Sequence, residues 1–154
     1  MMAATPLSMK LCGLETDVPF VIQWHMFAMF APSFIAGSLI GKYGYQKVVM
    51  LGFLLFAGGV VAGLMGIGVV HFFLTNIMIG AGWNFMLVGS TALLVTCHTE
   101  EEKGKVQGAN DTIAYILSAI SSFFAGYLQI KFGWSAVMIA IVPQLLLVAV
   151  AVLW

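Results

Sequence analysis

The sequence predicts an all-α membrane protein with five transmembrane helices. Of its 154 residues, 62% are hydrophobic and 8% are charged, and the mean hydropathy is +1.06. A soluble domain has roughly 45–50% apolar and about 25% charged residues. A chain of this size cannot bury so much apolar surface in a core of its own, so lipid must surround most of its side chains.

The apolar residues form five runs, each near the roughly 20 residues that a helix needs to cross the hydrocarbon core. We expect spans at about 18–40, 48–67, 70–96, 106–130 and 135–154. Strands are excluded because they end after about 4–8 residues. Residues 1–17 fit no span and are interpreted as the tail of a helix followed by an external loop, so that residues 1–154 form a single membrane domain.

The first span contains Gln23 and His25 beside Trp24. A histidine in a membrane helix either binds a solute or lies at the membrane interface, and the neighbouring tryptophan favours the interface. Pro32 lies in the middle of the same span. Because a proline has no N–H, it removes the hydrogen bond to the carbonyl of Ala28, and we expect a kink there.

Glycines four residues apart follow in the first two spans, as the pairs Gly37 and Gly41, and Gly59 and Gly63. This spacing lets two helix backbones approach closely in lipid. We expect tight packing at both pairs. Sliding contacts between helices are the alternative.

Polar residues at membrane depth are the main functional candidates, because an unpaired polar group in lipid costs several kcal/mol. Asn84 follows Trp83 in the third span, and its amide must reach either a partner helix or a water-filled cavity. Asn110 and Asp111 lie in the fourth helix, with Tyr115 one turn further on the face of Asp111. Asp111 either carries a proton or simply lies at the headgroup level, and the second interpretation is slightly favoured.

The start of the fourth helix has the pattern of a capping box. Thr99 is followed three residues later by Glu102, within an acidic run at 100–102 that suits the first turn of a helix. If the helix begins at Thr99, Asp111 lies about 18 Å along it.

The lysines predict the orientation. Four lie in the loops 41–47 and 97–105, which fall on one side, and two lie on the other side. The positive-inside rule places these two loops in the cytoplasm, with the N-terminus outside and the C-terminus inside. Cys12 and Cys97 then lie on opposite sides of the membrane, which excludes a disulfide between them.

Several classes of function are disfavoured. The formal net charge is zero, which argues against a nucleic-acid partner. The sequence has no phosphate-binding loop, no metal-ligand spacing and no catalytic constellation. We therefore expect no enzyme activity, no cofactor and no metal.

The run from Gly37 to Lys47, with Gly41, Lys42 and Gly44 inside it, resembles the cytoplasmic loop motif of the major facilitator superfamily. Further runs are similar to later helices of that family, namely 20–34, 82–85, 105–111 and 126–134. In order, they resemble the end of helix seven through helix twelve. The resemblance implies a partial C-terminal six-helix bundle of a secondary transporter in the inner membrane of a bacterium.

The resemblance also implies roles. A small solute, with protons as a possible coupling ion, would cross between this part and the missing N-terminal half. The candidates for the substrate cavity are Trp83, Asn84, Tyr115, His25 and Gln23. Asp111, Asn110 and the loop motif would belong to the cytoplasmic gate. By itself the chain is expected not to transport. The alternatives are a small membrane scaffold or assembly protein, and a half-size carrier that dimerises.

Overall fold

The computed structural model describes residues 2–99 and 101–153, and the described residues contain helices and no strand. The elements are α1 (Ala4–Leu11), the 3-10 turn η1 (Glu15–Asp17), α2 (Val18–Phe30), α3 (Ser33–Tyr43), α4 (Tyr45–Met65), α5 (Val69–Val95), α6 (Lys103–Phe132) and α7 (Trp134–Leu153). Five stretches of the described chain are long and apolar enough to cross a membrane: Glu15–Tyr43, Tyr45–Met65, Val69–Val95, Lys103–Phe132 and Trp134–Ala151. The predicted fold class is confirmed.

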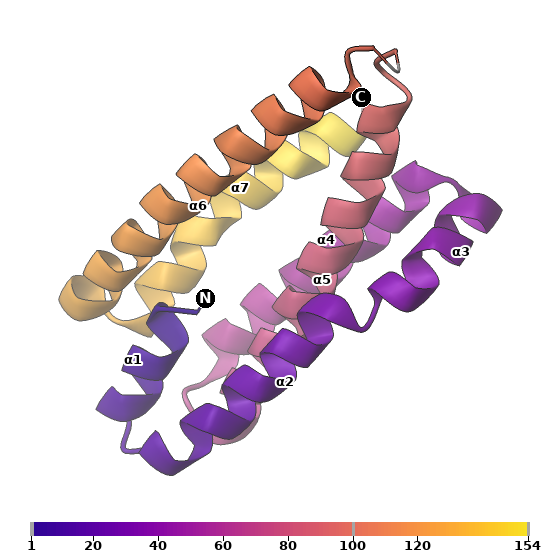
Figure 1. Cartoon of the computed structure of the whole chain (residues 1–154). Coiled ribbons are helices and arrows are strands. Elements are labelled where there is room, and N and C mark those ends of the chain that lie inside the picture. Colours follow the sequence, from indigo (N-terminus) through magenta and orange to yellow (C-terminus); the bar gives the residue numbers. More distant parts are fainter. Residues whose placement is uncertain (1, 100, 154) are drawn as a thin grey trace.

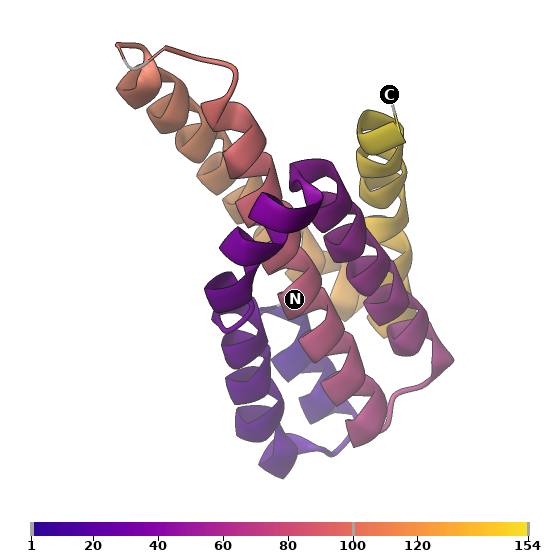
Figure 2. The same ribbon diagram turned by 90° about the vertical axis from the view of Figure 1, so that its right-hand side faces the viewer.

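The helices form two groups with α1 between them (Figure 1). In one group α5 packs against both α4 and α2, and α3 contacts α4 and α5. In the other group α6 and α7 form an antiparallel pair, and α7 also contacts α4. The short helix α1 contacts α2, α5, α6 and α7. Figure 2 shows the connection between α5 and α6 projecting at one end, the end at which the chain terminus after α7 also lies.

The closest helix crossing joins α4 and α5 at two glycines. A Cβ on Gly82 would lie 2.6 Å from the carbonyl oxygen of Gly52, and a Cβ on Gly52 would lie 2.7 Å from the carbonyl oxygen of Gly82. Backbone therefore meets backbone, which only glycine permits at this distance.

The predicted packing glycines divide into two cases. A Cβ on Gly59 would lie 2.7 Å from Ile79, and one on Gly63 would lie 2.6 Å from Met138, so tight packing is confirmed at this pair. At Gly37 and Gly41 the prediction is wrong, because a Cβ would have no neighbour within 4 Å. The reason is that no other helix of the described chain covers this face of α3.

The kink expected at Pro32 is an interruption of the helix at Ala31 and Pro32, which both keep helical backbone angles. Helix α2 ends at Phe30 and α3 begins at Ser33. The last backbone bond of α2 runs from the N–H of Ala31 to the carbonyl of Phe27, over 2.8 Å. The missing N–H of proline interrupts the ladder at the next position.

The expected capping box is wrong. Helix α6 begins at Lys103, and Glu102 precedes it without a side-chain capping bond. The hydroxyl of Thr99 donates to the carboxylate of Glu102 over 3.2 Å, and the N–H of Glu102 donates to the carbonyl of Thr99 in a turn. The acidic run therefore precedes the helix, with Glu100 outside the described residues, and Asp111 lies about 12 Å from the helix start.

Candidate functional site

A buried polar junction joins α1, α2 and α5. Asn76 of α5 is fully buried, and its Oδ1 accepts a hydrogen bond from the hydroxyl of Thr5 over 3.2 Å. Its Nδ2 donates to the carbonyl of Phe72, which holds the amide in one orientation. Nδ1 of His25 lies 2.6 Å from the carbonyl oxygen of Asn76. Because a carbonyl only accepts, Nδ1 carries a proton and donates it to this oxygen.

A second polar contact lies about two turns further along α5, where Asn84 faces the break in the first span. Its Nδ2 donates to the carbonyl of Met29 and to the hydroxyl of Ser33, both over 2.6 Å. Its Oδ1 is buried and has no partner among the described residues. The amide therefore reaches a partner helix, which is one of the two interpretations left open by the sequence.

The other cavity candidates are separate from these contacts. Gln23 and Tyr115 are exposed, Tyr115 to 78%, and Trp83 is exposed to 38%. Asn110 and Asp111 are both exposed, and Nδ2 of Asn110 donates to the Asp111 carboxylate over 3.2 Å. Within this chain, the candidates therefore do not converge on one closed site.

The loop motif forms the turn between α3 and α4. Gly44 has a φ of +84°, a conformation that side-chain-bearing residues rarely adopt. Its N–H donates to the carbonyl of Ile40, which ends α3. The ammonium of Lys42 lies 5.1 Å from the ring centre of Tyr43. Lys47 is exposed at the start of α4.

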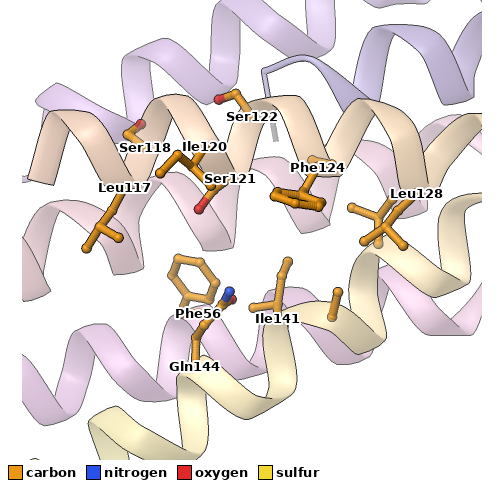
Figure 3. A pocket seen from close by; sticks show the side chains of 13 residues that line it. Phe56, Leu117, Ser118, Ile120, Ser121, Ser122, Phe124, Leu128, Ile141 and Gln144 are labelled. Atoms are coloured by element: carbon orange, nitrogen blue, oxygen red, sulfur yellow. The ribbon is translucent and has the colours of Figure 1, made fainter.

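An open cleft of about 650 Å³ separates α6 from α4 and α7 (Figure 3). Its polar lining consists of Ser118, Ser121 and Ser122 from α6 and Gln144 from α7, and Phe56 of α4 closes its side. The helix α6 is otherwise poorly packed: of its described residues only Gln129 is buried, whereas α5 has nine buried residues. Serines and a glutamine at membrane depth make this the polar face of α6.

Sequence reasoning missed the junction and the cleft. The only sign of the junction in the sequence is that Asn76 and Thr5 are polar residues within apolar segments. The serines of α6 recur within about one turn, which would have marked one helix face as polar. Among the described residues, no group of three His, Cys, Asp or Glu side chains is placed to hold a metal ion.

Comparisons with known proteins define the class. Residues 11–154 match the sequence profile of the Major Facilitator Superfamily, and the chain belongs to this family. It is 43% identical to the riboflavin transporter RfnT of Brucella anthropi over 97% of its own length. It is also 29% identical to the MFS-type transporter YdeG and 28% identical to the MFS-type transporter YddS, both of Bacillus subtilis, over 98% and 99% of its length.

The chain spans 38% of the length of the first relative and 36% of each of the other two. No solved structure matches it significantly. Together with the five spanning helices, the family establishes a multi-pass membrane protein, and its named relatives are transporters rather than enzymes.

Proposed function

We propose that this chain is the C-terminal part of a secondary transporter that moves a small solute across the inner membrane of a bacterium. The single observation that carries the proposal is the 43% identity to a riboflavin transporter over nearly the whole chain. Riboflavin, or a solute of similar planar aromatic chemistry, is therefore the first candidate substrate. Coupling to protons is part of the proposal.

The proposed roles of five candidates follow their exposure. Trp83, Tyr115 and Gln23 contribute to a cavity that the N-terminal half completes, and Asp111 with Asn110 belongs to the cytoplasmic gate. His25, which is buried at the junction with Asn76, remains a proposed cavity residue on the family resemblance alone. The loop motif 37–47 lies in the cytoplasm, with the N-terminus outside and the C-terminus inside. The 154 residues act as one membrane domain. The scaffold protein and the dimeric half-size carrier remain rival proposals.

The test replaces the matching stretch of the Brucella anthropi transporter with this chain. We expect the resulting full-length protein to support riboflavin uptake by a riboflavin-auxotrophic bacterium, whereas the isolated 154-residue chain supports none. Within the hybrid, Trp83→Ala is expected to lower uptake about tenfold, which corresponds to about 1.4 kcal/mol. Initial uptake of labelled riboflavin provides the measurement.

Trp24→Ala is the matched control. Trp24 is similarly exposed at 41%, but its ring packs among Phe20, Phe27 and Phe73 in an aromatic cluster that suits the membrane interface. Its replacement should leave uptake within about twofold. A hybrid that is inserted in the membrane but takes up no riboflavin would remove riboflavin as the substrate, and uptake by the isolated chain would favour the dimeric carrier.

The cleft beside α6 supports the need for further helices. Helix α1 has 8 residues, or about 12 Å, and cannot cross a hydrocarbon core of about 30 Å. Its N-terminal end lies between the two helix groups (Figure 1), and it already contacts α6 and α7. We propose that the remainder of helix seven in the full-length transporter continues α1 into the cleft, where its polar groups meet Ser118 and Ser121.

A photo-crosslinking residue at Ser121 tests this placement in the hybrid. We expect crosslinks to the segment that directly precedes the exchanged stretch, detected by mass spectrometry after proteolysis. The same residue at Phe123, which is 75% exposed and does not line the cleft, should give crosslinks to lipid instead. Crosslinks from Ser121 to lipid alone would contradict the placement, and crosslinks to a second copy would indicate a dimer.

A further inference from the structure

The break between α2 and α3 is bridged by a side chain from another helix. Among the described residues no backbone hydrogen bond joins Ser33 to Met29, although this pair would be bonded in a continuous helix. The carbonyl of Met29 accepts a hydrogen bond from Nδ2 of Asn84 instead, and the same nitrogen donates to the hydroxyl of Ser33. One amide of α5 thus holds the end of α2 and the start of α3 together.

The orientation of this amide is determined by the break. Met29 offers only a carbonyl acceptor, so the NH2 group of Asn84 must face it. The opposite atom, Oδ1, is buried without a partner, in a side chain that is only 2% exposed. A buried unpaired acceptor is unfavourable. The two hydrogen bonds that Nδ2 donates across the break therefore outweigh the cost of leaving Oδ1 unpaired.

The two arms of the break differ in how firmly they are packed. Three residues of α2 are buried, and they are Val21, His25 and Ala28. In α3 only Ala36 is buried, and Gly37 and Gly41 have open space where a side chain would be. The arm α2 is therefore fixed to α5 by fully buried residues, whereas beyond Ala36 the arm α3 is held by the partly buried Leu39 and Ile40, which pack against Val48 and Phe85.

We propose that Asn84 is a positioning residue that latches α3, and that residues 31–32 form a hinge about which α3 swings when the latch opens. The swinging arm ends at Tyr43 and therefore carries residues 37–43 of the loop motif with it, whereas Lys47 stays on α4. That this movement operates a cytoplasmic gate rests on the proposed function, but the latch and the hinge do not.

The test measures the position of the far end of α3 in the isolated chain in lipid nanodiscs. Spin labels replace Lys42 on α3 and Val61 on α4, after Cys12 and Cys97 have been changed to serine. With 11 residues, α3 is about 16 Å long, and a pivot of about 20° moves its end by about 5 Å. We expect Asn84→Ala to broaden the distance distribution and shift it by about this amount, and Asn84→Asp, which loses both donors, to do the same.

A second-site change separates the latch from general packing. Pro32→Ala restores the N–H and allows a continuous helix, in which the N–H of Ser33 satisfies the carbonyl of Met29. In the double variant Asn84→Ala with Pro32→Ala, we therefore expect a narrow distribution again. A label pair at Gln23 and Val61, which reports on α2 before the hinge, should stay unchanged throughout and shows that the bundle is folded.

Two results would overturn the proposal. One is an unchanged distribution between labels 42 and 61 in Asn84→Ala. The other is a broad distribution that persists in the double variant while the pair at 23 and 61 remains narrow. Neither measurement depends on a solute, so a failure to transport riboflavin would not contradict the latch. In the same way, a failure of the latch test would not contradict the proposed transport.

Discussion

Replacing Gly82 by alanine is expected to destabilise the folded bundle by about 3 kcal/mol, the upper part of the range for overpacked sites. The new Cβ would lie 2.6 Å from the carbonyl oxygen of Gly52 and 2.7 Å from the backbone nitrogen of Phe56. Both are backbone atoms, so no side chain can rotate away, and α4 and α5 must separate. The change is measured as the shift in the unfolding midpoint in mixed micelles of dodecylmaltoside and SDS.

Gly37→Ala is the matched control for this prediction. The same atom is added to a helix, but nothing lies within 4 Å of it. Because alanine is a better helix former than glycine, this variant should be neutral or more stable by up to about 1 kcal/mol. If Gly82→Ala and Gly37→Ala unfold at the same midpoint, the close crossing of α4 and α5 is incorrect.

Replacing Trp134 by alanine is expected to cost about 3–5 kcal/mol, as for a large buried aromatic residue. Trp134 is 5% exposed and begins α7. Its Nε1 donates to the carbonyl of Gly63 over 2.8 Å, near the end of α4, and its ring meets Phe72 of α5 edge-on at 4.8 Å. One side chain therefore joins three helices. Steric trapping or the same micelle titration measures the loss.

Two variants separate the contributions of Trp134. Trp134→Phe keeps most of the ring contact and loses the hydrogen bond, so a cost of about 1–2 kcal/mol is expected. Trp83→Ala removes a tryptophan that is 38% exposed and should cost less than Trp134→Ala by at least about 2 kcal/mol. Equal losses at Trp134 and Trp83 would show that the junction at the start of α7 does not stabilise the bundle.

The sequence was sufficient for the number of spans and the class of protein because both depend on local composition. Hydropathy identifies a span from its own residues, and the loop motif lies within one run of the chain. The partners of buried groups cannot be predicted in this way, because they come from segments that are distant in the sequence. The two glycine pairs have identical spacing, yet only Gly59 and Gly63 have a helix against them.

The candidate site shows the same limit. The sequence left Asn84 between a cavity and a helix contact, and Pro32 was read only as a kink. The two features explain each other, but their residues are more than 50 positions apart, as the bond from Asn84 to Ser33 shows. The capping box predicted at Thr99 was wrong although its residues are neighbours in the sequence. The hydroxyl of Thr99 bonds to the carboxylate of Glu102 rather than to the helix backbone.

The contrast between α5 and α6 has a consequence for the life of the protein in a cell. Helices that have been inserted one by one into a bilayer associate afterwards, so α4 and α5 can pair as soon as both have left the ribosome. In contrast, α6 finds few buried contacts among its neighbours and keeps its serines uncovered. Until that surface is covered, α6 is the helix that contributes least to holding the bundle together, and its backbone is expected to open first.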